Sequence, residues 1–230
     1  MARNPRQNVA FPSNGRQAHG YLKAPESGQG PGVVVIQEWW GLTDHVVDVC
    51  DRFAAEGFVA LAPDLYGGRT THDAADAGRL MRRLPVAQAA RDLSGAVDYL
   101  LGHEAVTGRR VGAVGFCMGG GFVLVLAANA GEKVGAAVPF YAVLRGEPDL
   151  SGIKAPVLGH FGEADESIPV ETARSLERRI RDAAGVEVTF HLYSGAGHAF
   201  FNDENHLGTY HPAYAKWAWN RTLEFLRANL

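Results

Sequence analysis

The sequence predicts an α/β protein with a mostly parallel sheet flanked by helices on both faces. Along its 230 residues, short apolar runs rich in valine alternate with longer amphipathic segments, and this alternation is typical of parallel sheets. The runs are nearly continuous, as expected of strands that are covered on both faces. Because no repeat, low-complexity segment or long linker divides the chain, we expect one domain over residues 1–230.

The first half of the chain contributes a hairpin, two buried strands and three helices to this prediction. Within residues 1–25, "NVAF" and "AHGYLKA" flank the turn residues "PSNG", which indicates a peripheral hairpin. The strands are expected in "GVVVIQE" and "FVALAPD". The helices are expected in "DHVVDVCDRFAAEG", which Gly57 would end, "DAADAGRLMRRL" and "VAQAARDLSGAVDYLLG".

The second half continues the alternation to the end of the chain. Further strands are expected in "RVGAVGF", "VGAAVPFY", "APVLGHFGE" and "VEVTFHLYS". The helices are expected in "GGGFVLVLAANAG", "PVETARSLERRIRDAAG" and "AYAKWAWNRTLEFLRANL". Sites in such sheets form at the carboxyl ends of the strands, so reactive residues directly after these runs are the candidates for function.

Composition and charge exclude several classes of protein. The formal net charge is −3, with acids and bases mixed along the chain, which argues against nucleic-acid or membrane-surface partners. Two cysteines cannot form a disulfide framework, and the first residues lack the apolar stretch of a signal peptide, so we expect a cytoplasmic protein. The uncharged segment Val111 to Gly131 is rich in glycine, which favours a buried strand, turn and helix over a membrane span.

Cys117 follows the strand "RVGAVGF" directly and opens the next helix. The sequence Gly115-Phe116-Cys117-Met118-Gly119 has the G-x-nucleophile-x-G spacing of a strand–helix elbow, with cysteine in place of serine. Glycines flank the nucleophile in this motif because the sharp turn leaves no room for their side chains. The helix amino terminus would also favour the thiolate. The alternative is an inert buried cysteine, which is common in protein interiors.

Asp165 and His198 complete the order of residues that a catalytic triad requires. Asp165 follows the strand "APVLGHF", and His198 lies in a glycine-rich loop after the last strand. Alone, Asp165 could be a turn residue, with Glu163 and Glu166 as rivals for its role, and His198 could be a solvated side chain. Nucleophile, acid and histidine in this order, each after a late strand, are typical of a hydrolase triad.

The sequence resembles the dienelactone hydrolase family, within the α/β-hydrolase superfamily, over nearly its whole length. The motifs that carry the resemblance are "VVVIQEWWGL", "APDLYGG", "GFCMGG", "FGEADESIP" and "GAGHAFFND". The resemblance implies that Cys117, Asp165 and His198 form the triad. It also implies that Cys117 attacks a lactone or ester carbonyl and forms a thioester acyl-enzyme, with no cofactor.

Glu38 matches the family's glutamate beside the resting cysteine. It also ends a buried strand at the same edge of the sheet, where it could accept or hold the thiol proton. By resemblance, the backbone N–H groups of Met118 and Trp39 form the oxyanion hole, and the first agrees with the rule for nucleophile elbows. The residues expected to wall an apolar pocket, or else to belong to the core, are Trp39, Trp40, Tyr66, Phe116, Tyr141, Phe200 and Phe201.

One departure from the family concerns the substrate. Members that cleave dienelactones place an arginine four residues after the histidine, where it binds the substrate carboxylate, and this chain has Asn202 there. The second family arginine has no counterpart by motif, although Arg69, Arg79, Arg82 and Arg83 are nearby. We therefore expect neutral esters or lactones as substrates, with a side activity on neutral phosphotriesters as an alternative.

Two other classes of function were weighed against the hydrolase. A metallohydrolase is disfavoured because none of the nine histidines has H-x-H or H-E-x-x-H spacing, and His206 and His211 lie five apart. No metal site is therefore expected. A thiol sensor on a hydrolase scaffold would need only a reactive cysteine, not Asp165 and His198 in triad order. The expected partner is a small-molecule substrate, and we expect a monomer or a weak homodimer.

Overall fold

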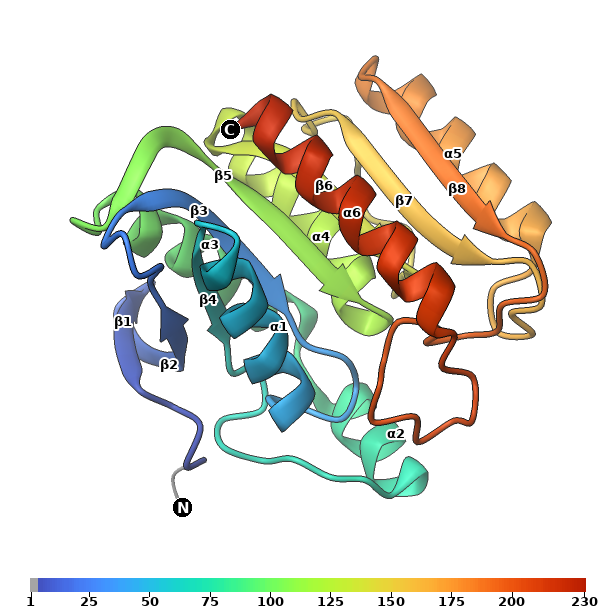
Figure 1. Ribbon diagram of the computed structural model, residues 1–230, viewed down its shortest axis with the longest axis horizontal. Coiled ribbons are helices and arrows are strands. Elements are labelled where there is room, and N and C mark those ends of the chain that lie inside the picture. The colour runs from blue at the N-terminus through green and yellow to red at the C-terminus, as the bar shows by residue number, and fades with distance from the viewer. Residues whose placement is uncertain (1–3) are drawn as a thin grey trace.

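The computed structural model describes residues 4–230 and contains one eight-stranded sheet (Figure 1). The strand order is β1-β2-β4-β3-β5-β6-β7-β8. β1 (Val9–Ser13) pairs antiparallel with β2 (Arg16–Lys23), and β2 pairs antiparallel with β4 (Val59–Pro63). Every later pair of neighbours is parallel. The predicted α/β fold with a mostly parallel sheet is confirmed, and the expected hairpin within residues 1–25 forms the edge of that sheet.

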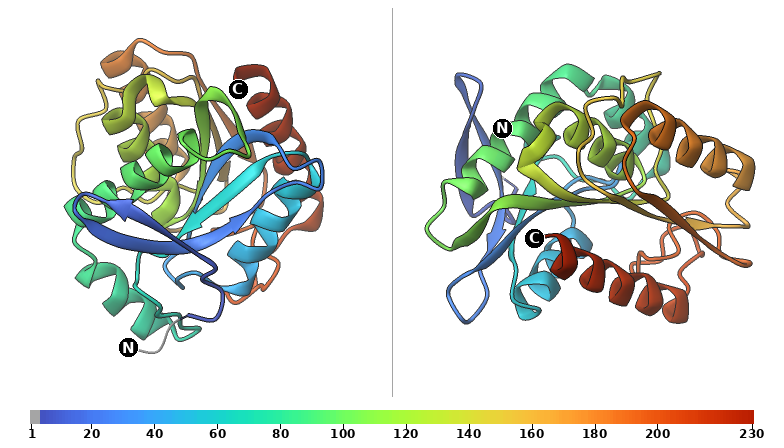
Figure 2. Two further views of the ribbon diagram at one scale, coloured as in Figure 1. Left: turned by 90° about the vertical axis from the view of Figure 1, so that its left-hand side faces the viewer. Right: turned by 90° about the horizontal axis from the view of Figure 1, so that it is seen from above.

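Helices cover both faces of the sheet (Figure 2). α1 (Asp44–Ala55) and α6 (Pro212–Asn229) lie on one face, and α3 (Val86–Leu101), α4 (Met118–Ala130) and α5 (Val170–Ala184) lie on the other. α2 (Ala74–Arg83) precedes α3 in the chain. Within residues 4–230, no helix is long and apolar enough to cross a membrane.

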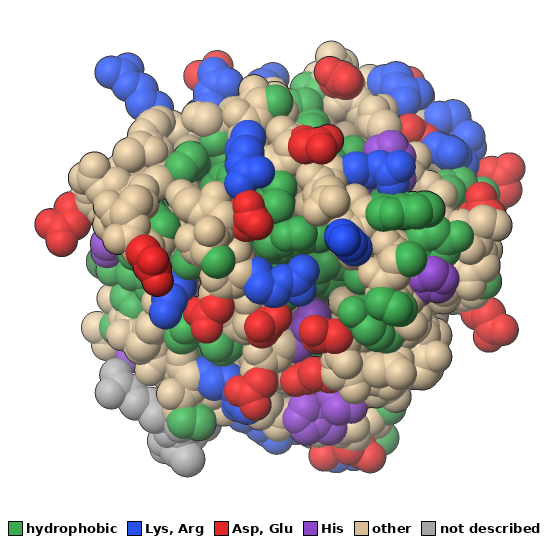
Figure 3. Space-filling view, in the orientation of Figure 1, with side chains coloured by type: hydrophobic (Ala, Val, Ile, Leu, Met, Phe, Trp, Pro, Cys, Tyr) green, Lys and Arg blue, Asp and Glu red, His purple; other side chains and the backbone are tan. Residues whose placement is uncertain are grey.

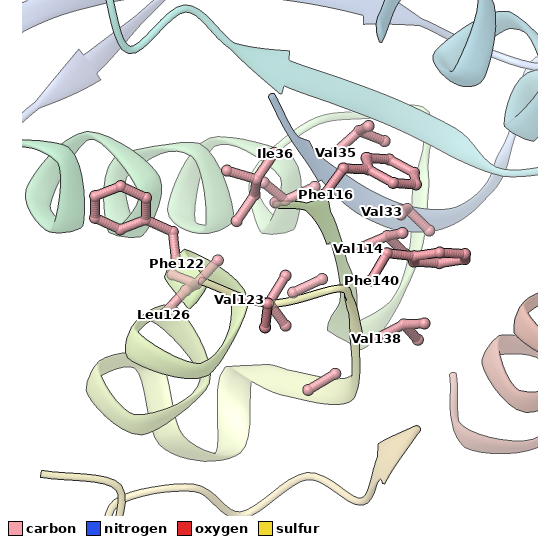
Figure 4. Packing of buried hydrophobic residues seen from close by; sticks show 14 of the residues in the cluster. Val33, Val35, Ile36, Val114, Phe116, Phe122, Val123, Leu126, Val138 and Phe140 are labelled. Atoms are coloured by element: carbon pink, nitrogen blue, oxygen red, sulfur yellow. The ribbon is translucent and has the colours of Figure 1, made fainter. Parts of the chain in front are cut away.

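The central strands are buried on both faces over their apolar runs, as those sequences predict. These strands are β3 (Gly30–Ile36), β5 (Val106–Phe116), β6 (Val134–Phe140) and β7 (Val157–Gly162), while β8 (Val188–Tyr193) forms the far edge of the sheet and is partly exposed. Side chains alternate between the faces of a strand, so Val33 and Val35 point to one layer and Ile36 to the other, the side on which α4 carries Phe122 (Figure 4). Burial on both faces fixes the register of these strands.

β5 begins earlier than its apolar run suggests. The strand starts at Val106, although residues 107–110 are exposed, and the pairing shifts register between Val111 and Gly112. A bulge of this kind adds residues to a strand without moving its far end. The carboxyl end of β5 therefore stays level with that of β3, where Ile36 pairs with Gly115.

Candidate active site

Cys117 occupies a sharp turn between β5 and α4. Its φ of 54° and ψ of −116° lie in a region that residues with a side chain rarely adopt. Backbone hydrogen bonds hold the turn: the Cys117 N–H donates to Phe140 O at 3.1 Å, and the Cys117 carbonyl accepts from Val143 at 3.0 Å. Such strain persists only where the surroundings enforce it, and it is common at nucleophiles.

Gly115 and Gly119 allow the turn to close. A Cβ atom on Gly119 would lie 2.3 Å from the Ile36 carbonyl oxygen, and one on Gly115 would lie 2.4 Å from the Gly119 carbonyl oxygen. Any side chain at either position would push α4 away from β3 or β5. The steric reason for the glycine spacing is therefore present in the structure.

Asp165 and His198 form a hydrogen-bonded pair in the loops after β7 and β8. The distance from His198 Nδ1 to Asp165 Oδ2 is 2.7 Å. The other oxygen of Asp165 accepts hydrogen bonds from the N–H groups of Ser167 and Ile168, at 2.8 and 2.9 Å. The carboxylate is buried, and its orientation is fixed by these three contacts. Both rival acids, at positions 163 and 166, are exposed.

Electrostatics favour a charged His198. Burial lowers the pKa of this imidazole, but its interactions with Asp165 and Cys117 outweigh burial and raise the pKa to about 10. Contributions from both partners mean that the thiol, the imidazole and the carboxylate interact as a group. An imidazolium next to a thiol favours the thiolate, which is the nucleophilic form of cysteine.

Glu38 lies just beyond β3, buried and hydrogen-bonded through both oxygens. Tyr141 Oη donates to Oε1 at 3.0 Å, and Asn202 Nδ2 donates to Oε2 at 2.6 Å. Burial, followed by the charge and hydrogen bond of Glu38, raises the pKa of Tyr141 well above its usual value. Cys117 also raises that pKa, so Tyr141, the hydrogen-bond partner of Glu38, lies within electrostatic reach of the thiol.

The aromatic side chains proposed for the pocket divide into two groups. Phe116 and Phe201 are buried and stack on each other with ring centroids 5.1 Å apart, and Phe200 is buried against Tyr141. These three rings pack in the core, which agrees with the alternative that aromatic residues near strand ends belong to the core. Partial exposure remains at Trp39 and Tyr66, while Trp40 is buried against Trp39.

Tyr66 contacts the residue that follows the nucleophile in the elbow, Met118. Its hydroxyl lies 3.5 Å from the Met118 sulfur, and burial followed by the charge of Cys117 raises its pKa. Trp39 and Trp40 follow Glu38 directly, and the Trp40 carbonyl accepts from the Thr71 N–H at 3.0 Å. Met118 adjoins the thiol directly, and the segment with Trp39 and Trp40 is held by the loop that contains Thr71.

The four arginines considered from the sequence are exposed, and a fifth lies closer to the site. Arg69, Arg79, Arg82 and Arg83 are on the surface, where Arg79 pairs with Asp76. Arg145, in the loop after β6, is half-buried, and its charge lowers the pKa of Tyr66 against the larger effects of burial and Cys117. Sequence analysis missed Arg145, although its place shortly after a strand end was an available signal.

An open cavity of about 550 Å³ lies beside these loops. Its walls include Val143, which is bonded to the Cys117 carbonyl, and Ile168, which is bonded to Asp165. Glu147 and Arg179 also line it and form an ion pair. The catalytic candidates themselves do not line this cavity, so it adjoins the site and is not its centre.

A cysteine at a strand–helix elbow, followed by an acid and a histidine after later strands of a parallel sheet, defines an α/β-hydrolase. The sequence matches the dienelactone hydrolase family over residues 18–230. The chain therefore belongs to the dienelactone hydrolase family.

Three similar proteins illustrate the relationship. The chain is 36% identical to the protein usf of Aquifex pyrophilus, an alignment that covers 97% of this chain and 99% of the relative. A provisionally named dienelactone hydrolase of Klebsiella pneumoniae has a TM-score of 0.83 and 32% identity, covering 95% of this chain and 96% of the other. A dienelactone hydrolase-like promiscuous phosphotriesterase from metagenomic libraries has a TM-score of 0.86 and 28% identity, covering 97% of both chains.

Proposed function

We propose that this hydrolase cleaves small lactones or carboxylic esters through a Cys117 nucleophile and a thioester acyl-enzyme. The observation that carries the proposal is the hydrogen bond between His198 Nδ1 and Asp165 Oδ2, at 2.7 Å. This bond leaves the other ring nitrogen, Nε2, for exchange of a proton with the thiol. The contribution of Cys117 to the raised pKa of His198 supports the same pairing.

In the proposed acylation step, His198 holds the proton that it has taken from the Cys117 thiol, and the thiolate sulfur bonds to the carbonyl carbon. The backbone N–H groups of Met118 and Trp39 would stabilise the negative oxygen of the tetrahedral intermediate. The intermediate collapses when the carbon–oxygen bond to the leaving group breaks. The leaving alkoxide takes the proton from the imidazolium and leaves a thioester.

In the proposed deacylation step, a water molecule replaces the leaving group. His198 accepts one proton of the water as its oxygen attacks the thioester carbon. Breaking the carbon–sulfur bond releases the carboxylic acid, and the proton returns to the sulfur. Asp165 remains ionised throughout and keeps the imidazole oriented.

Neutral substrates fit this site better than carboxylate-bearing ones. Asn202 stands where dienelactone-cleaving relatives are expected to hold an arginine, and its amide already donates to Glu38 at 2.6 Å. A substrate carboxylate near that position would meet the Glu38 carboxylate and gain no cation there. Burying an unpaired charge is costly, so we propose short neutral esters or lactones as the substrate class.

Neutral phosphotriesters are a second candidate class. Support comes from the 28% identical structure of a promiscuous phosphotriesterase, which covers 97% of this chain. The same thiolate would bond to phosphorus and expel an aryloxide, which takes up the imidazolium proton. Because water must then attack a less reactive phosphorus centre, we expect slower turnover than for esters.

The two free thiols, Cys50 and Cys117, also favour a reducing compartment, for which we propose the cytoplasm. Cys50 is fully buried in α1, and burial raises the pKa of its thiol, so it would stay unreactive. A monomer or weak homodimer remains the prediction for assembly, and gel filtration over a range of concentrations would test it.

The test of the proposed function is hydrolysis of a short aryl ester by Cys117→Ala, His198→Ala and the double variant. We expect each single variant to lose most of kcat/KM and the double variant to be little worse, because residues that act as a unit are strongly non-additive. Cys117→Ser should be heavily impaired as well, since a hydroxyl needs a stronger base. Substantial esterase activity in Cys117→Ala would refute the proposed mechanism.

A further inference from the structure

His72, Glu204 and His206 form a cluster outside the triad. One ligand atom from each residue lies within 4.8 Å of those from the other two. The rings of His72 and His206 are 4.4 Å apart between centroids, and His206 Nε2 lies 3.2 Å from Glu204 Oε2. His72 and His206 are exposed and Glu204 is half-buried. Figure 3 shows histidine and acidic side chains gathered low on the face where Figure 1 places α2 and the loop before α6.

The distances suit a tetrahedral metal ion. Ligands bound at about 2.0–2.1 Å in tetrahedral geometry lie roughly 3.3 Å apart, and the His206–Glu204 pair is already at 3.2 Å. The third ligand, His72, is an exposed side chain that can close the remaining gap by rotation. Two imidazoles and one carboxylate, with an open fourth position for water, are a ligand set that zinc commonly takes in proteins.

Glu204 is held in place by groups that do not compete with a metal. Its Oε1 accepts from the His45 backbone N–H at 3.3 Å, and its own N–H donates to Asn202 Oδ1 at 2.9 Å. Oε2 is left facing His206. Contacts of this kind fix the orientation of a ligating carboxylate before the ion arrives.

His72 is flanked by two anchored residues. The Thr71 N–H donates to the Trp40 carbonyl at 3.0 Å, and Asp73 caps α2 by accepting from the Asp76 N–H at 2.8 Å. The loop that carries His72 is thus fastened to the segment after Glu38 on one side and to α2 on the other. His206 in turn packs against Trp40, with ring centroids 5.6 Å apart.

We propose that His72, Glu204 and His206 bind one divalent transition-metal ion, with zinc as the best match. The ion would join the loop between β4 and α2 to the loop between β8 and α6, next to the segment of Trp39 and Trp40. It takes no part in the proposed thiol chemistry. Imidazole ligands favour zinc, nickel and copper over magnesium and calcium, which prefer oxygen ligands alone.

The test is a calorimetric titration of untagged protein with zinc chloride. The Cys117→Ala variant serves as the background, because a thiol beside an imidazole could itself bind zinc. In that background, His72→Ala and His206→Ala each remove one ligand. Both positions are exposed, so the substitutions leave the packing of the core intact. His103→Ala is the matched control: His103 lies before the amino end of β5, whereas the cluster lies in loops that follow the carboxyl ends of β4 and β8.

We expect one zinc ion per chain in the background variant and in its His103→Ala derivative. Affinity should fall at least about tenfold in the His72→Ala and His206→Ala derivatives, since each loses a direct ligand. Magnesium chloride should produce no binding signal in any variant. An absence of zinc binding, or an affinity that both histidine substitutions leave unchanged, would overturn the proposal.

Discussion

Asn202 and Glu38, 164 residues apart in the sequence, are joined by a 2.6 Å hydrogen bond from the Asn202 amide to the Glu38 carboxylate. Asn202 occupies the position where relatives that cleave dienelactones are expected to bind a substrate carboxylate with arginine. In this chain the Asn202 amide is uncharged, and it donates a hydrogen bond to the buried Glu38 carboxylate instead of binding a substrate. The contact therefore links substrate choice to the environment of the thiol.

The first prediction concerns substrate charge. A bidentate arginine–carboxylate contact is worth about 1.5–3 kcal/mol, so its absence should cost about one to two decades in kcat/KM. We expect a neutral lactone or short aryl ester to be preferred over a dienelactone of similar reactivity. The measurement is kcat/KM for both substrates under the same conditions.

Arg145 provides the control for that prediction. If the dienelactone is clearly preferred, the idea of a neutral pocket fails. In that case Arg145→Ala should remove the preference, because this half-buried arginine lies within electrostatic reach of Tyr66. Arg69→Ala, at an exposed position, is the matched variant that should leave it unchanged.

The second prediction concerns Glu38. Glu38→Gln places an amide against two donors, the Tyr141 hydroxyl and the Asn202 amide, so one hydrogen bond must break or rearrange. We expect a buried unsatisfied group to cost about 1–3 kcal/mol of stability, and the loss of the negative charge to change thiolate formation. The readout is the pH profile of alkylation of Cys117 by iodoacetamide, with Tyr141→Phe for comparison. Identical profiles in wild type and Glu38→Gln would leave Glu38 a structural role only.

The third prediction concerns stability at alkaline pH. The pKa of folded His198 is raised to about 10, above the value of about 6.5 expected in the unfolded chain. The stabilising contribution is therefore complete below pH ~6.5 and is lost progressively as the pH rises towards ~10. Asp165→Asn should flatten this part of the pH dependence.

Urea unfolding across that pH range provides the measurement. The quantity to compare is the difference in free energy of unfolding between wild type and Asp165→Asn, because pH effects from the rest of the chain are common to both and cancel. Glu163→Gln, at an exposed acid two residues earlier, is the control and should follow wild type. A difference that stays constant with pH would contradict the assigned cause of the raised pKa.

The sequence was enough to predict the sheet and the three triad candidates. Each of Cys117, Asp165 and His198 follows a strand, and parallel strands end at one edge, so position along the chain implied closeness in space. The Asn202–Glu38 bond was out of reach, because it depends on side-chain orientation across two distant loops. Spacing rules for metal ligands also overlooked His72 and His206, since they apply within one element and these residues come from separate loops.

The aromatic residues show a second limit of sequence analysis. Phe116, Phe200 and Phe201 flank the motifs, but they are buried in the core, whereas Trp39 and Tyr66 stay partly exposed. Both groups follow or precede strand ends, and a large apolar ring suits a pocket wall and a core equally well. Only the packing of the neighbouring strands decides between the two.

The measurement that tests the central claim most directly is mass spectrometry of the protein quenched with acid during hydrolysis of a slowly turned-over neutral aryl ester. The account predicts one acyl group on the peptide that contains Cys117. Hydroxylamine should remove this group, as it does from a thioester, and the Cys50 peptide should stay unmodified as the internal control. A burst of product with the acyl group on another residue, or with no acyl group on Cys117, would contradict it.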